Sequence, residues 1–179
     1  VPLLDRIVVG LDPATTAGAG SDECGIVVVG AQTQGPPQDW RAVVLADCTV
    51  QGATPSGWAR AAISAMAQYG ADRLVAEVNQ GGQMVAEVLR QVDPLVPVKS
   101  VHASRGKVAR AEPVAALYEQ GRVGHVAGLD ALEDQMCRMT ARGYEGGGSP
   151  DRVDALVWAL HELMIEPAAQ WRMPGVRGL

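Results

Sequence analysis

Three short apolar runs in the first fifty residues constrain the fold most, because nothing between them has a helical pattern. The runs are 6–11 (RIVVGL), 24–31 (CGIVVVGA) and 40–50 (WRAVVLADCTV). Each has the length and the Val-rich composition of a buried strand. A loop rich in Gly, Ala, Thr and Ser and a turn with two prolines join them. We therefore expect an antiparallel meander at the start of the chain.

Helices and strands alternate in the rest of the chain. Expected helices are 54–69, 82–92, 107–120, 129–139 and 151–165, and expected strands are 73–78, 96–101 and 123–126. The last helix has the clearest amphipathic pattern, and the Gly-rich segment 142–150 before it predicts a flexible loop. This order predicts an α/β fold, a mixed β-sheet of three antiparallel strands and then parallel strands, flanked by helices. We expect one domain over 1–165 and a flexible C-terminal tail over 166–179.

Composition excludes several classes of protein. The 179 residues suit one domain, and 47% hydrophobic with 20% charged residues is globular composition. A formal charge of −5 argues against a histone-like DNA coat but permits a local basic strip. No apolar run approaches the roughly 18–20 residues of a membrane span. The three cysteines form no CxxC pair, and charged residues at 5 and 6 interrupt any signal peptide. We expect a reduced, cytoplasmic protein, cut from a longer chain because it starts so close to a strand.

Four carboxylates stand at positions that can meet over one sheet edge. Asp12 ends the first expected strand and Glu77 the fourth, while Asp151 and Asp154 share a face at the start of the last helix. Converging carboxylates repel each other unless a cation lies among them, and oxygen ligands suit Mg²⁺ or Mn²⁺. Two such ions about 4 Å apart can clamp a phosphodiester during hydrolysis. The pattern therefore predicts a metal-dependent catalytic site.

Each acid also has an ordinary structural interpretation. Asp12 could be a turn residue, and Asp151 could be an N-cap or a first-turn acid that favours the helix dipole. Glu77 follows the apolar LVA of a buried strand, where a carboxylate is costly without a partner. Asp154 lies among apolar helix positions. The four together indicate a site more specifically than any one of them.

Several residues predict contact with nucleic acid. Arg105, Lys107 and Arg110 precede or open a helix, whose first N–H groups also favour phosphate. They form either a DNA-backbone contact or a solvated helix start. Asn79 follows Glu77 in a short polar and Gly-rich segment, which either lets DNA approach or is a plain turn. The histidines lack ligand spacing and are read as structural.

Four stretches carry a resemblance to a known family. They are IVVGLDPATTAGAGSDECGIVVVG, RLVAEVNQGGQMVAEVL, VHASRGKVARAEPVAALYEQGRVGHV and SPDRVDALVWALHELM. In these stretches the chain resembles the C-terminal nuclease domain of the large terminase subunit, the DNA-packaging motor of tailed bacteriophages and related gene transfer agents. The resemblance implies an RNase H-like fold and two-metal endonuclease cleavage. It matches the family's first-strand Asp to Asp12, its fourth-strand acid to Glu77, and its helix pair to Asp151 and Asp154.

The resemblance also implies cofactors and partners. Two divalent ions, Mg²⁺ or Mn²⁺, would serve the cutting of concatemeric double-stranded DNA during genome packaging. The partners would be an N-terminal ATPase domain, the portal and the small terminase subunit, in the cytoplasm of the bacterial host. The ATPase domain's GxxxxGK[ST] loop is absent from this sequence.

Three alternatives remain open from the sequence. A Holliday-junction resolvase would use a similar set of acids in the same fold, with a stable dimer and a preference for branched DNA. An actin-like or sugar-kinase-like nucleotide-binding domain also begins with a strand, an Asp and a Thr/Gly loop. A catalytically silent docking module would keep the fold without metal dependence.

Overall fold

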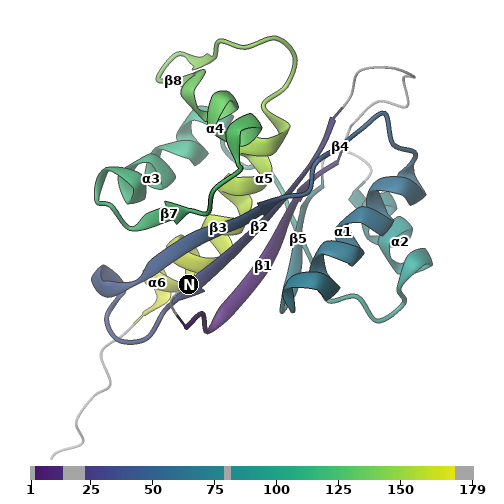
Figure 1. The fold of residues 1–179 in the computed structure, drawn as a ribbon, viewed down its shortest axis with the longest axis horizontal. Helices are drawn as coiled ribbons and strands as arrows, with labels where there is room; N and C mark the ends of the chain where they lie inside the picture. Colours follow the sequence, from purple (N-terminus) through teal and green to yellow (C-terminus); the bar gives the residue numbers. More distant parts are fainter. Residues whose placement is uncertain (1–2, 14–22, 79–81, 172–179) are drawn as a thin grey trace, which may run out of the picture.

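A mixed sheet with helices on both faces forms the protein (Figure 1). The structure is a computed structural model that describes residues 3–13, 23–78 and 82–171. Within this part of the chain the main sheet has seven strands, in the order β6-β5-β1-β2-β3-β7, and β4 pairs with β2. No helix in the described ranges combines the length and apolarity that a membrane crossing needs.

The strands follow the predicted meander and then the predicted parallel additions. Their bounds are β1 Arg6–Asp12, β2 Glu23–Gln32, β3 Arg41–Asp47, β4 Val50–Gln51, β5 Arg73–Glu77, β6 Val98–Val101 and β7 Val123–His125. β1, β2 and β3 pair antiparallel, whereas β5 and β7 join β1 and β3 in parallel and β6 joins β5 in parallel. A short 3₁₀ helix, Pro37–Asp39, lies between β2 and β3. The expected meander and fold class are confirmed.

The helices divide between the two faces of the sheet. On one face lie α1, Pro55–Tyr69, and α2, Gly82–Val92. On the other lie α3, Lys107–Glu119, α4, Asp130–Cys137, and α5, Asp151–Leu160. A π-helical turn, His161–Ile165, continues α5 into α6, Glu166–Gln170. Successive β1 residues alternate between the two cores, Val8 in one and Val9 in the other, as the pleat requires.

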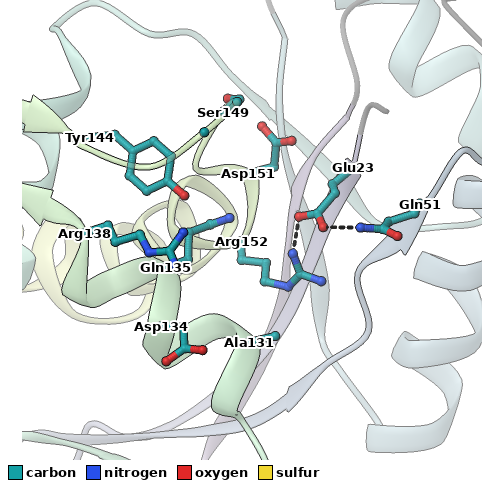
Figure 2. Close-up of a pocket in the computed structure, with 12 residues that line it drawn as sticks. Glu23, Gln51, Ala131, Asp134, Gln135, Arg138, Tyr144, Ser149, Asp151 and Arg152 are labelled. Carbon is teal, nitrogen blue, oxygen red and sulfur yellow. Dashed lines mark hydrogen bonds and ion pairs between the residues drawn. The ribbon is translucent and has the colours of Figure 1, made fainter. Parts of the chain in front are cut away.

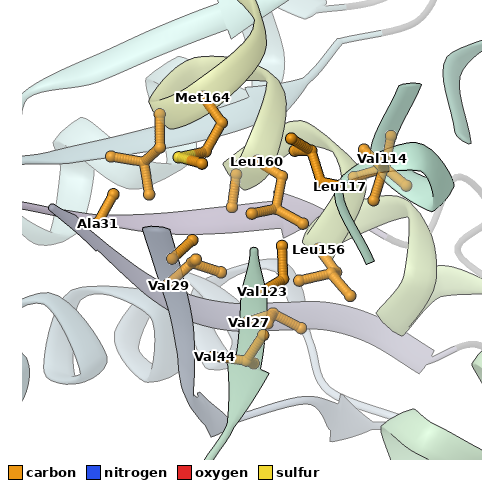
Figure 3. Packing of buried hydrophobic residues seen from close by; sticks show 14 of the residues in the cluster. Val27, Val29, Ala31, Val44, Val114, Leu117, Val123, Leu156, Leu160 and Met164 are labelled. Carbon is orange, nitrogen blue, oxygen red and sulfur yellow. The ribbon is translucent and has the colours of Figure 1, made fainter. Parts of the chain in front are cut away.

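Helix α5 fills the centre of the core that also holds α3 and α4. Figure 3 shows Leu156 and Leu160 of α5 among the valines of the central strands. Two glycines let α5 lie directly on the sheet. A Cβ at Gly10 would stand 2.0 Å from the Ala155 carbonyl oxygen, and one at Gly25 would stand 2.0 Å from that of Asp151. The first turn of α5 is therefore held at the end of β1.

The structure differs from the expected elements where strands are very short. The third apolar run is interrupted after Asp47, because the Asp47 carboxylate accepts a hydrogen bond from the Thr49 N–H at 3.0 Å. The helix expected over 129–139 ends at Cys137. Met139–Thr140 (β8) then pairs with Gly143–Tyr144 (β9), inside the segment expected to be a loop. Two-residue strands carry no periodic pattern, so they could not be predicted.

The expected tail begins within a helix. Residues Ile165, Ala168 and Trp171 pack against the main core, so the chain as far as 171 lies on the domain. Residues 172–179 lie outside the described part, and their flexibility stays a prediction.

Candidate metal centre

Two of the predicted acids lie side by side at one sheet edge. Asp12 and Glu77 are the last residues of β1 and β5. These strands run parallel and pair Leu11 with Ala76, so the residues that follow are neighbours at their carboxyl ends. Asp12 is 8% exposed and Glu77 is 6% exposed. Two carboxylates at this depth need compensating partners.

Helix α5 brings the other two acids to the same edge. Asp154 is 3% exposed and Asp151 is half-buried. The N-cap position is Pro150, which makes no side-chain cap, so Asp151 is a first-turn acid. The close approach at Gly25 is to the Asp151 backbone itself. The glycine contact therefore positions the acidic turn against the strand ends.

The acids are close enough to disturb each other's ionisation. Burial raises the pKa of Asp12 well above its ordinary value of 3.8, and the negative charges of Asp154, Glu77 and Asp151 raise it further. Burial also raises the pKa of Asp154, against the opposing effect of two nearby cations, Lys107 and Arg110. The four predicted residues thus form one electrostatic cluster.

Two cations lie inside this cluster. Lys107 Nζ contacts Asp154 Oδ2 and donates to Ser149 Oγ at 3.1 Å. Arg110 Nη1 lies 3.4 Å from Glu77 Oε2, and its Nη2 lies 3.9 Å from Asp154 Oδ1. The hydrogen bond and the charges of the acids outweigh the effect of burial, so the pKa of Lys107 is raised. Lys107 and Arg110 are therefore the cationic partners of the buried acids.

Trp158 contacts both Glu77 and Arg110. Its indole N–H donates to Glu77 Oε2 at 2.7 Å, and its ring lies 4.6 Å below the Arg110 guanidinium carbon. The sequence reasoning missed Trp158, although it follows Asp154 by four residues and so shares its helix face. It also missed that Arg110, three residues after Lys107, lies on the same face of its helix and therefore also faces the acids.

The predicted basic cluster does not form one surface strip. Arg105 is exposed, Lys107 lies at the rim of the acidic site, and Arg110 is 6% exposed beside Glu77 and Asp154. Arg110 therefore faces the acids instead of solvent. Asn79 lies outside the described residues, and its predicted contact with DNA stays a prediction.

A polar surface pocket of about 390 Å³ adjoins Asp151 (Figure 2). Its wall includes Arg152, which pairs with Glu23 and, at 2.8 Å, with Asp47. The other lining residues are Gln51, Ala131, Asp134, Gln135, Arg138, Tyr144, Gly147, Gly148 and Ser149. The pocket lies beside the acidic cluster, and Asp151 is the predicted acid that lines it.

Glu162, in the π-helical turn that follows α5, is a buried acid outside the acidic cluster. Its carboxylate pairs with Arg6 at 3.2 Å, Arg73 at 2.9 Å and Lys99 at 2.6 Å. Lys99 also pairs with Glu166 at 2.7 Å. These cations outweigh the effect of burial and lower the pKa of Glu162. Arg6 and Arg73 begin β1 and β5, and Lys99 lies in β6. The ion pairs of Glu162 therefore lie at the opposite end of β1 from Asp12.

The chemistry of the acidic cluster fits a divalent cation. It supplies oxygen donors only, and the pKa values of Asp12 and Asp154 are raised by burial, an effect that a bound cation would oppose. As the side chains lie, no three His, Cys, Asp or Glu groups in the described ranges could hold a metal ion. Lys107 and Arg110 take up the acids' charge instead. Metal binding by these acids would therefore require their side chains to rearrange.

Comparison with known proteins identifies the family. A family model for the terminase RNaseH-like domain matches residues 9–163. The chain belongs to this family. The predicted resemblance and the RNase H-like fold are both confirmed. A search of curated protein sequences found no significant match.

Solved structures share the fold. The large terminase nuclease from thermophilic phage G20c is 20% identical, with TM-score 0.66, over 88% of this chain and 82% of that chain. The same nuclease with bound magnesium gives TM-score 0.67 at 19% identity, over 91% of this chain and 84% of that one. That nuclease has also been crystallised with bound cobalt and with bound zinc.

Proposed function

We propose that this terminase RNaseH-like domain is a metal-dependent endonuclease that cuts concatemeric double-stranded DNA during genome packaging. The observation that carries the proposal is the meeting of Asp12, Glu77, Asp151 and Asp154 at one sheet edge in a member of this family. The catalytic acids would be those four, and they would hold two divalent ions, Mg²⁺ or Mn²⁺. The magnesium, cobalt and zinc bound by the G20c nuclease support a divalent-metal requirement.

When bound, the ions would supply Lewis-acid polarisation of the phosphodiester and of the attacking water. The chain's own residues prepare the site for this chemistry. Asp12 is close enough to Glu77, Asp151 and Asp154 for their charges to raise its pKa, and it would hold a divalent ion together with them. Trp158 holds Glu77 in orientation through its N–H. No protein nucleophile is required.

Contact with DNA must overcome a net charge of −5. We propose that Arg105 and Lys107 contact the phosphate backbone; the exposure of Arg105 and the partial exposure of Lys107 beside the acids support this. Each lost phosphate contact should lower the salt slope of DNA binding by roughly one unit. In the full protein we propose an N-terminal ATPase domain, with the portal and small terminase subunit as partners, in the host cytoplasm.

The test is nicking of supercoiled plasmid in Mg²⁺, Mn²⁺ or EDTA. Wild type should nick with metal and not in EDTA, and Asp12→Asn should remove the activity with the fold intact. Asp72→Asn is the matched control. Asp72 lies at the opposite end of β1 and β5, where it accepts a hydrogen bond from the Ile7 N–H at 2.8 Å. Nicking by Asp12→Asn at the wild-type rate in Mn²⁺ would refute the site.

A further inference from the structure

We propose that Lys107 is a built-in counter-cation of the metal-free site, which gives up Asp154 when the divalent ions bind and so sets the metal affinity. The inference rests on the proposed function, because it concerns the same acids. It assigns Lys107 a positioning role in addition to any contact with DNA. Three observations carry it: its contact with Asp154, its exposure, and the contrast with Arg110.

Lys107 is placed to leave without opening the fold. Its ammonium contacts the buried Asp154, yet its side chain is 43% exposed. Lysine carries a compact charge on a flexible stem, so rotation of that stem withdraws the charge into solvent. Ser149 lies in the exposed loop before α5 and already accepts a hydrogen bond from Lys107. The ammonium therefore already has a partner on the solvent side of Asp154.

Arg110 cannot leave in this way. It is 6% exposed, lies over the Trp158 ring, and its Nε and Nη1 find no hydrogen-bond partner among the described residues. Its charge is balanced by ion pairs to Glu77 and Asp154. Arg110 is therefore the permanent cation of the site, and Lys107 the exchangeable one.

The charge count favours an exchange of this kind. With all four carboxylates ionised, Lys107 and Arg110 leave two negative charges in the site. One divalent ion would neutralise them. A second would leave the pocket with two positive charges, which is costly where groups are partly desolvated. Withdrawal of Lys107 would remove one of these charges and leave Asp154 free to hold a divalent ion.

Calorimetric titration of Mn²⁺ into the metal-free 179-residue chain tests the inference. Lys107→Met should bind Mn²⁺ more tightly, on the order of tenfold, since no internal cation then competes. In EDTA the same variant should melt below wild type, and its Mn²⁺-induced shift should be larger. Lys107→Arg keeps the charge and should restore an affinity nearer to wild type than to Lys107→Met.

Lys99→Met is the matched control, because it removes a half-buried lysine from the ion-paired acid Glu162. It should lower the melting temperature with and without metal and leave Mn²⁺ affinity unchanged. Unchanged or weaker Mn²⁺ binding by Lys107→Met would overturn the inference while leaving the proposed function standing. Failure of wild type to bind Mn²⁺ at all would overturn both.

Discussion

Gly25→Ala should disturb the acidic site without changing any of its side chains. The added methyl carbon would stand 2.0 Å from the Asp151 carbonyl oxygen and 2.5 Å from its carbonyl carbon. Ordinary van der Waals contact begins at 3.4 Å. The start of α5 must therefore withdraw by the difference, about 1.4 Å. Backbone lies on both sides of this contact, so no side-chain rotation can relieve it.

Two effects of different size follow from this displacement. Inserting a methyl group into close packing costs about 1–3 kcal/mol, which lowers the melting temperature of a domain of this size by roughly 3–10 °C. For catalysis, a misplacement of about 1 Å can cost on the order of a hundredfold in rate. Activity should therefore fall much further than stability alone explains.

The assay compares plasmid nicking rates in Mn²⁺ with thermal melts in EDTA and in Mn²⁺. Gly124→Ala is the control, because Gly124 lies in β7 with nothing within 4 Å of an added Cβ. It should change stability by less than about 0.5 kcal/mol. If Gly25→Ala melts and cuts like Gly124→Ala, the close packing of α5 on β2 does not place the acids, and the reasoning fails.

Three further predictions concern charges and hydrogen bonds. Burial, and then the charges of its acidic neighbours, raise the pKa of Asp12 in the folded protein. The contribution of Asp12 to folding stability is therefore complete below pH 3.8 and is lost as pH rises through the raised pKa. Metal-free melting temperatures should fall over that range, and Asp12→Asn should flatten the fall; an equally steep profile would contradict this. Trp158→Phe removes the 2.7 Å bond to Glu77 and should weaken Mn²⁺ binding at least tenfold by calorimetry; wild-type affinity would exclude an orienting role. Glu162→Gln should cost about 2 kcal/mol near pH 7, a modest figure because the partner cations are a third or more exposed. Because cations lower the pKa of Glu162, that cost should vanish as pH falls below 4.5 through the folded value, and a pH-independent cost in denaturant titrations would refute the assignment.

The elements with long apolar patterns were predictable from the sequence, usually to within two residues. The Val-rich strands β1 and β2 must bury their apolar side chains, and so must the apolar face of α5. Packing against each other satisfies both requirements. The β8–β9 hairpin and the break before β4 were not predictable. They depend on side-chain hydrogen bonds such as that of Thr140 Oγ1 to the Gly143 carbonyl.

The site was predictable in its acids but not in its cations. An acid that ends a buried strand must lie at the edge of the sheet where that strand ends. The positions of Asp12 and Glu77 therefore followed from the topology alone. Whether Arg110 faces solvent or the acids depends on the rotation of α3 against α5. That rotation is set by packing between residues distant in sequence, including the stacking of Arg110 on Trp158. No local pattern in the sequence encodes it.

The order of elements along the chain delays the assembly of the acidic cluster during synthesis. Asp12 and Glu77 belong to strands made early, whereas Asp154 belongs to the helix that follows every strand of the main sheet. A nascent chain that stops before α5 lacks both helix acids, Asp151 and Asp154, and leaves the sheet face around Val8, Val27 and Val29 uncovered. The burial that completes this core is thus also the step that assembles the acids. The four acids of the proposed site are therefore first brought together when that helix docks.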